Sequence, residues 1–414
     1  MTTDHRATGR RPRRWPHGLI ALVLLTAVAA CGGGGRAPSA APSSGSPSGG
    51  PSGSPSTGAG GSSSAPVSPA APPPSCAQRT LDGLDRPARI GQLLMVGVPA
   101  TDPVSGYRQL AGVPVGGVFL HGRSSAGVAA VAAQVAQLQA VAPVPLQVAV
   151  DQEGGLVQTL TGPGFDLVPT GLRQGALTPD ALRTATAAWA GQLRAAGITM
   201  DLAPVADTVP AGREEQNPPI GAFDRQYGSD PARVASAVQT VVGALQDAGV
   251  AATPKHFPGL GRVRVNTDEA AGATDPDTTP LDPYLQPFAA AVRSGTGAVM
   301  VSSATYPQLD PDRLAVFSPA VVGLLRAQLG FRGVVVTDDL GAAQALAAVP
   351  TGQRAVDAIA AGVDVVLTVR TADAAPMAQA LADRAAADPG FAARVDESAL
   401  RVLALKERFG LLAC

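Results

Sequence analysis

A lysine and a histidine stand side by side at positions 255 and 256, directly after the small apolar run 250–253. A proline and two glycines within 258–261 end any regular structure behind them, and Asp268 follows in the same loop. An ammonium, an imidazole and a carboxylate can together bind and transform a polar ligand. The pattern therefore predicts a strand that delivers Lys255 and His256 to a functional loop.

Three other segments place charged residues behind apolar runs: Asp151 in AVDQEGG, Arg225 in PPIGAFDRQYG, and Asp338 with Asp339 in VVVTDDLGA. A buried strand would carry such residues to one end of a sheet. Two acidic groups that flank a bond are what glycoside hydrolysis requires, one as nucleophile and one as proton donor. The alternative for Asp338 and Asp339 is that they cap the following helix, and we assign that task to Asp339.

Short β-rich runs alternate with longer Ala/Leu/Arg stretches, the pattern of repeated β-α units. Helical spacing marks 179–196 and 231–248, and residues 124–150 fit a surface helix, a turn and a strand. The expected strands are 93–98, 116–120, 146–151, 198–202, 250–254, 298–302, 334–337 and 363–367. Eight strands predict a single α/β domain of the TIM-type (β/α)₈ barrel class. A doubly wound open sheet is the alternative.

From about residue 81 to residue 412, these motifs and their order resemble the β-N-acetylglucosaminidases of glycoside hydrolase family 3. The shared residues are Lys-His-Phe-Pro-Gly at 255–259 and Thr-Asp-Asp-Leu at 337–340. The resemblance implies an exo-acting, retaining β-glycosidase that uses no cofactor. It implies Asp338 as the covalent nucleophile, and it implies that the sugar is held by Asp151, Arg225, Lys255 and His256.

The family's proton donor is a histidine in an Asp-Ser-His triplet, and this chain has Asn266, Thr267 and Asp268 there, with Leu260 at an earlier loop histidine. Asp268, or Glu269 beside it, would have to donate the proton instead. That role requires a raised pKa, which closure of the 259–269 loop over the sugar would supply. The alternative is a solvated loop carboxylate.

Positive groups that are common in similar enzymes are also missing, with Leu156, Thr159 and Ser303 in their places. We expect this loss to weaken binding of acidic muramyl or peptide groups, and N-acetylglucosamine in wall fragments is the leading substrate.

Several site residues have a second interpretation. Asp151 and Arg225 could form an internal salt bridge, and His256 could be a packed, satisfied histidine. Lys255 could form a Schiff base in a lyase. The whole domain could instead be a sugar-binding barrel that has lost its acid/base.

The first 31 residues carry arginines, the apolar run 19–30 and a small-residue signal before Cys31, which predicts an exported lipoprotein anchored to the outer face of the cytoplasmic membrane by lipid on Cys31. An uncleaved signal anchor is the alternative. Residues 32–75 are nearly all Gly, Ser, Pro and Ala, which predicts a disordered tether. The globular domain would span 76–414.

In an exported protein Cys76 and Cys414 could pair or remain free thiols, and we expect a disulfide.

A formal net charge of −1 without a basic block gives no support for binding nucleic acid. The two histidines of the expected mature domain lack the spacing of metal ligands, so we expect no metal. The expected partners are a carbohydrate substrate and the membrane, through the lipid anchor. We expect the protein to be a monomer.

Overall fold

The computed structural model describes residues 74–414. Residues 1–73, which hold the predicted leader with Cys31 and nearly all of the predicted tether, lie outside the described residues. Ser75 begins the first helix as its N-cap, and its side chain accepts a hydrogen bond from the Gln78 N–H.

Eight parallel strands form a closed barrel. Six of them pair in the order β12-β1-β2-β3-β6-β7, and β11 pairs with β8. Two junctions close the ring: the Phe257 N–H donates to the Met300 carbonyl beyond β7 (2.7 Å), and Val336 bridges to Val365 between β11 and β12. The barrel strands are β1 Leu94–Pro99, β2 Gly117–His121, β3 Gln147–Val150, β6 Met200–Asp201, β7 Ala251–Ala252, β8 Ala298–Val301, β11 Val334–Thr337 and β12 Val366–Thr368. The predicted (β/α)₈ barrel is confirmed, and the open-sheet alternative is wrong.

Two antiparallel hairpins extend the loops after β3 and β8. They are β4 Gln152–Gly154 with β5 Val157–Gln158, and β9 Thr305–Tyr306 with β10 Asp310–Leu314. The first hairpin matters for function, because it directly follows Asp151.

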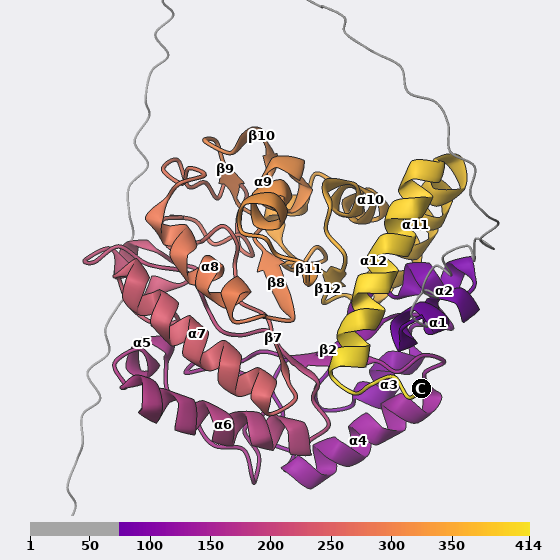
Figure 1. The fold of residues 1–414 in the computed structure, drawn as a ribbon, viewed down its shortest axis with the longest axis horizontal. Helices are drawn as coiled ribbons and strands as arrows, with labels where there is room; N and C mark the ends of the chain where they lie inside the picture. Colours follow the sequence, from indigo (N-terminus) through magenta and orange to yellow (C-terminus); the bar gives the residue numbers. More distant parts are fainter. Residues whose placement is uncertain (1–73) are drawn as a thin grey trace, which may run out of the picture. The chain divides into compact units, whose positions relative to one another are not determined.

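Helices surround the strands, with α6, α7 and α8 following one another along one side and α12 beside α1 (Figure 1). Each of the eight strands is followed by at least one helix before the next strand begins. The main helices are α1 Cys76–Gly83, α2 Arg86–Gly91, α3 Pro103–Arg108, α4 Val128–Val141, α5 Gly171–Gln174, α6 Pro179–Ala195, α7 Pro231–Asp247, α8 Gln286–Arg293, α9 Pro319–Gly323, α10 Thr351–Ala361, α11 Ala374–Ala387 and α12 Pro389–Arg408. Short turns of 3₁₀ or π helix lie at Glu214–Gln216, Gly221–Phe223, Pro283–Leu285, Ala315–Phe317, Leu324–Gln328, Gln344–Leu346 and Thr371–Asp373.

Several helices begin at an Asp, Ser or Thr that is followed at once by proline. In α6, α7 and α12 the caps are Thr178, Asp230 and Asp388, whose side chains accept backbone N–H groups of the first turn. The cap satisfies a donor that the helix leaves unpaired, and proline needs none at that position. These dipeptides therefore fix where the helices start.

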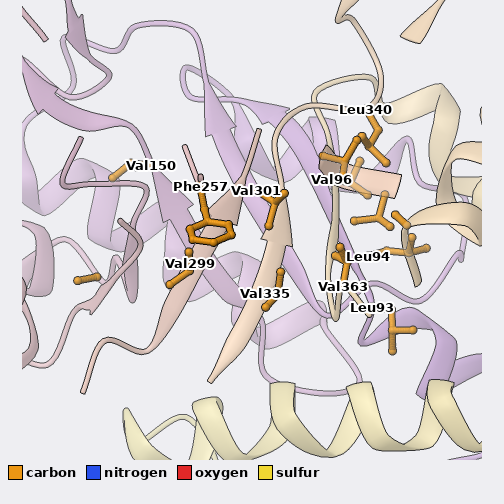
Figure 2. Packing of buried hydrophobic residues seen from close by; sticks show 14 of the residues in the cluster. Leu93, Leu94, Val96, Val150, Phe257, Val299, Val301, Val335, Leu340 and Val363 are labelled. Carbon is orange, nitrogen blue, oxygen red and sulfur yellow. The ribbon is translucent and has the colours of Figure 1, made fainter. Parts of the chain in front are cut away.

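The core has two layers. Outside the strands, Phe257 lies beside Val299 and Val301 (Figure 2), and these side chains are buried under the helices. Inside the barrel, methionines, small residues and valines fill the lumen, and the same cluster includes Val402 and Leu405 of α12 and Phe409 directly after it. The C-terminal helix thus closes the end of the barrel opposite to the strand C-termini, and the functional groups gather at the open end.

The two ends of the described chain are joined. Cys76 and Cys414 form a disulfide with their Cα atoms 5.8 Å apart. The Glu407 carboxylate also accepts the N–H groups of Cys76 and Ala77 at 3.1 and 3.0 Å. Within residues 74–414 no helix combines the length and the apolar character needed to cross a membrane.

Candidate active site

A cavity of about 380 Å³ opens at the C-terminal ends of the barrel strands. Such ends carry the active site in barrels of this type. The six residues that the sequence assigned to substrate chemistry line it, and they come from the loops after four strands, β3, β6, β7 and β11. They are Asp151, Arg225, Lys255, His256, Asp268 and Asp338.

Glu153 lies behind the charged wall of this cavity and connects two of its lining residues, Arg225 and Lys255. Its carboxylate forms a two-pronged pair with Arg225, at 2.9 Å to Nε and 2.7 Å to Nη2. The Lys255 ammonium lies 2.6 Å from the same carboxylate and 2.5 Å from Asp151. Asp151 and Arg225 therefore do not form the direct salt bridge considered from the sequence, because Glu153 takes the guanidinium and Lys255 takes Asp151.

Burial alone would raise the pKa of Glu153, but the charges of Arg225 and Lys255 bring it down to about 2. Burial alone would lower the pKa of Lys255, but the carboxylates of Asp151 and Glu153 raise it above the ordinary lysine value. A Schiff-base lysine must lose its proton to attack a carbonyl. The ion pairs hold Lys255 in the protonated form, so the lyase interpretation has no support.

A third acid, Asp201, lies beneath this network at the end of β6 and is 3 % exposed. Its carboxylate accepts the Gln152 N–H at 3.0 Å. Burial raises the pKa of Asp201 to about 7, despite that hydrogen bond. With Asp201 protonated, two carboxylates face two cations, and the buried network is electrically balanced.

His256 is held by Asp207, which is fully buried. The Asp207 carboxylate lies 2.7 Å from the His256 Nδ1 and also accepts the N–H groups of His256 (3.2 Å) and Leu260 (2.7 Å). The imidazole is thus a satisfied histidine and a residue that lines the cavity, so the two interpretations of the sequence are compatible. Because Nδ1 is taken by Asp207, Nε2 is the nitrogen left for a ligand.

Asp338 and Asp339 follow β11 but have different surroundings. The Asp339 carboxylate is occupied by three N–H groups, those of Gly341, Ala342 and Val369, each at 2.8 Å. It caps a turn and fastens the end of β12, rather than the regular helix that we expected. Asp338 accepts only the Asp339 N–H at Oδ1 (2.9 Å), and within residues 74–414 its Oδ2 accepts no hydrogen bond. That oxygen is available to a ligand in the cavity.

The loop that carries Asp268 has a fixed stem. Asn217 donates from Nδ2 to the carbonyls of Leu260 and Val263, both at 2.7 Å. A Cβ on Gly261 would lie 1.8 Å from the Thr208 carbonyl oxygen, so only glycine fits this contact. The stem is therefore packed tightly against the segment after β6.

The tip of the loop has fewer contacts. Asn266 accepts the Asp268 N–H at 3.1 Å and donates to Glu269 at 3.1 Å. One backbone hydrogen bond, from the Ala345 N–H to the Thr267 carbonyl (3.2 Å), joins the tip to the segment that follows β11. The tip thus already lies beside the strand end that carries the nucleophile candidate.

Asp268 is exposed on this tip, yet it lines the cavity. Partial desolvation, followed by repulsion from the Asp338 carboxylate, raises the pKa of Asp268 to about 6. Its neighbour Glu269 does not line the cavity and is hydrogen-bonded to Asn266. Of the two proton donors considered from the sequence, Asp268 is the one that lines the cavity, and its raised pKa suits an acid.

Sequence reasoning gave no role to Glu153, Asp201 or Asp207. One signal was present: residues 151 and 153 are two apart, and in extended chain such residues face the same side. The role of Asp207 depends on how residue 205 aligns with residue 255, where the structure has a parallel bridge. Within the described residues no group of three His, Cys, Asp or Glu side chains could hold a metal ion.

Comparison with protein families gives one match over most of the domain. The family described as "Glycosyl hydrolase family 3 N terminal domain" matches residues 87–405. A protein named beta-hexosaminidase from Xanthomonas campestris pv. campestris (strain B100) is 38% identical over 304 residues, covering 70% of this chain and 88% of that protein.

The fold is also found in solved structures. A beta-N-acetylhexosaminidase from Beutenbergia cavernae DSM 12333 aligns with a TM-score of 0.76 and 48% identity, over 78% of this chain and 99% of the other. A family 3 beta-N-acetylglucosaminidase from Paenibacillus sp. str. FPU-7 aligns with a TM-score of 0.72 and 33% identity, over 80% of this chain and 64% of the other.

Proposed function

Because the chain belongs to glycoside hydrolase family 3, we propose that it is a retaining exo-β-glycosidase that removes terminal β-N-acetylglucosamine from cell-wall fragments. The enzyme class follows from the family, and the sugar is that of the similar enzymes. The observation that carries the mechanism is Asp338, whose free carboxylate oxygen meets the cavity that Asp151, Arg225 and Lys255 also line. The cavity is at the small end of ligand sites, roughly 300–1,000 Å³, which suits one terminal sugar.

The first chemical step forms an ester on Asp338. Its Oδ2 attacks the anomeric carbon, the glycosidic C–O bond breaks, and the bonding electrons leave with the aglycone oxygen. Asp268 gives that oxygen a proton, which is the task of an acid with a raised pKa.

The second step returns the enzyme to its starting state. Asp268, now a carboxylate, takes a proton from water, the water oxygen attacks the anomeric carbon, and the ester bond to Asp338 breaks. Two attacks on opposite faces give net retention. A phosphate dianion would meet the negative charge of Asp268 at this stage, so water is the expected acceptor.

The charged wall holds the sugar before and during these steps. The Asp151 side chain is 26% exposed, so its carboxylate can accept hydrogen bonds from sugar hydroxyl groups. Lys255, whose side chain is 4% exposed, fixes the orientation of that carboxylate. Arg225 and His256 supply further donors. Because the ion pairs exist without ligand, little reorganisation is needed when the sugar binds.

An arginine-lined cavity of about 570 Å³ supports an acidic aglycone. It lies on the other side of the Asp268 loop, and its lining includes Arg213, Arg262 and Arg264 together with Asp277. Arg262 is paired with Asp282 at 2.7 and 3.1 Å, whereas neither Arg213 nor Arg264 has a side-chain partner within residues 74–414. Since the proton donor stands beside the leaving oxygen, the aglycone must depart past this loop. These arginines lie outside the family motif. We expect them to supply the positive charge that is missing at Leu156 and Thr159.

Residues 1–75 add the proposed location. A lipid on Cys31 would anchor the enzyme to the outer face of the membrane, with 32–75 as the tether. Incorporation of labelled palmitate that disappears in Cys31→Ala tests this part separately. An unlabelled wild-type protein would contradict it.

The purified protein should release N-acetylglucosamine from aryl β-N-acetylglucosaminides, and NMR should show the β-anomer as the first product. Initial release of the α-anomer would contradict the ester on Asp338. Sugar binding without any turnover, on activated leaving groups as well as poor ones, would instead favour the sugar-binding barrel.

A further inference from the structure

A further charged cavity lies at the opposite end of the barrel. Its volume is about 410 Å³, and it is bounded by residues 295–297, residues 330–333 and the last turns of α12. The first two segments directly precede β8 and β11. This basal cavity is therefore at the N-terminal ends of strands whose C-terminal ends face the active site.

The charged residues of its lining are all arginines. They are Arg332, Arg401 and Arg408, and no Asp or Glu lines the basal cavity. Arg332 and Arg408 are exposed. Arg408 donates to the Gly295 carbonyl at 2.8 Å, and the Arg332 guanidinium has no hydrogen-bond partner among residues 74–414.

The neighbourhood behind the lining also carries excess positive charge. The fully buried carboxylate of Asp364 is shared by Arg326, Arg394 and Arg401. Glu397 pairs with the last two of these. Arg332 and Arg408 add two guanidinium groups that pair with no carboxylate among residues 74–414.

The buried arginines of this cluster also repel one another. Burial, assisted by repulsion from Arg401 and Arg394, lowers the pKa of Arg326 despite its pairing with Asp364. A group already under such repulsion gains from an additional anion nearby. Repulsion among these arginines thus persists despite their pairing with Asp364.

We propose that the basal cavity binds a phosphate group between Arg332 and Arg408. Guanidinium forks match the oxygen geometry of phosphate, and such charge-assisted pairs are the strong class of hydrogen bond. A phosphate dianion would cancel most of the surplus charge. Because the cavity is at the closed end of the barrel, a bound phosphate leaves the mouth free. A phosphate-bearing polymer or lipid could thus hold the enzyme by its base.

The test is calorimetric titration of the purified full-length protein with inorganic phosphate at constant ionic strength. Saturable binding is expected, and Arg332→Gln with Arg408→Gln should weaken it by roughly tenfold or more for each guanidinium lost. Arg401 stays unchanged in this variant, because it pairs with Asp364 and Glu397. The matched control, Arg173→Gln with Arg233→Gln, removes two exposed arginines elsewhere and should bind as the wild type does.

Two further titrations, with other phosphate compounds, identify the source of the phosphate. Tighter binding of glycerol phosphate indicates a monoester, and tighter binding of a soluble glycerol phosphate oligomer indicates a polymer. Either result supports the phosphate site. Absence of saturable binding, equal binding of acetate, or phosphate binding unchanged in the double variant would overturn it. Hydrolysis of an aryl glycoside by the double variant should remain at the wild-type rate, so this inference stands or fails independently of the proposed function.

Discussion

The two walls of the substrate cavity are built in different ways. On one wall, Glu153 joins Arg225 and Lys255 in a buried network of short ion pairs that includes Asp151. On the other wall, Asp268 lies on a loop tip that has turn hydrogen bonds and one backbone contact across the mouth, to Ala345. The wall that we propose to hold the sugar has its ion pairs in place without ligand, whereas the proposed proton donor on the other wall depends on its surroundings for acidity.

This difference coincides with the family motif. The ion-pair wall contains the residues to which the family resemblance assigns the sugar, whereas the loop tip has Asn266 and Asp268 in place of the motif's Asp and His. A carboxyl group at the tip can replace histidine only if neighbouring charge and partial burial raise its pKa. The Asp338 carboxylate provides the neighbouring charge, and the position of Asp268 in the cavity lining provides the partial burial.

Removal of the nucleophile should have the largest effect, because both walls act on a bond that Asp338 must attack. We expect Asp338→Asn to lower kcat by roughly 10⁴-fold or more. Unchanged thermal unfolding would show that the fold is intact, and azide should partly restore turnover of an activated aryl glycoside. Retention of a tenth of the wild-type kcat would contradict the role of Asp338.

Loss of the proton donor should be selective. Asp268→Asn should lower kcat/KM by about 10²–10⁴-fold for an alkyl or sugar aglycone, but only slightly for a dinitrophenyl glycoside, which needs no proton. Glu269→Gln is the matched control and should leave both rates unchanged. Equal losses on both substrates would show that Asp268 does not donate the proton.

The pH dependence of kcat/KM in the wild type tests whether the acid acts in its protonated form. A general acid works in its protonated form, so kcat/KM for a poor leaving group should fall as pH rises through about 6. The same limb should be absent in Asp268→Asn. A falling limb that persists at the same pH in the variant would assign it to another group.

Disruption of the ion-pair wall should affect stability as well as binding. Glu153→Gln leaves Arg225 and Lys255 partly unpaired, and removal of one partner of a buried pair costs about 3–5 kcal/mol. The folded pKa of Glu153, about 2, is below its ordinary value of 4.5. The stability that ionised Glu153 provides to the folded protein is therefore fully present above pH 4.5 and is lost as pH falls toward 2. Denaturant unfolding should show this acid-dependent loss in the wild type and less of it in the variant. Identical pH profiles would contradict the network.

The smallest expected effect concerns the aglycone. Arg213→Gln with Arg264→Gln should reduce the preference for a carboxylate-bearing aglycone by about tenfold, because both arginines are exposed and exposed charge pairs contribute only about 0.2–1 kcal/mol each. Rates on neutral aryl glycosides should not change. The variant Arg173→Gln with Arg233→Gln controls for general charge. An equal loss of activity on neutral and acidic substrates would contradict the proposed aglycone site.

Much of this molecule could be predicted from the sequence where the information is local. Apolar runs followed by polar residues indicated the eight strands, and helical spacing indicated α6 and α7 within a residue or two. The resemblance to the family placed Asp151, Arg225 and Lys255 on one cavity. These predictions depend on periodicity and on motifs that the chain itself displays.

What could not be predicted depends on contacts between distant segments. The partner of Arg225 is Glu153, 72 positions away, and His256 is held by Asp207, 49 positions away. The acidity of Asp268 depends on Asp338, which comes from another strand end. The role of Asp339 was also mistaken in detail, because the turn that it caps forms no regular helix.

The most direct test of the account is to identify the residue that carries the sugar. Incubation with a slowly released 2-fluoro glycoside, followed by peptic digestion and mass spectrometry, should find one added sugar on the peptide that contains Asp338 and on that residue. The adduct should be absent in Asp338→Asn. A sugar attached to any other residue, or turnover of the wild type without any adduct together with inverted product, would contradict the mechanism.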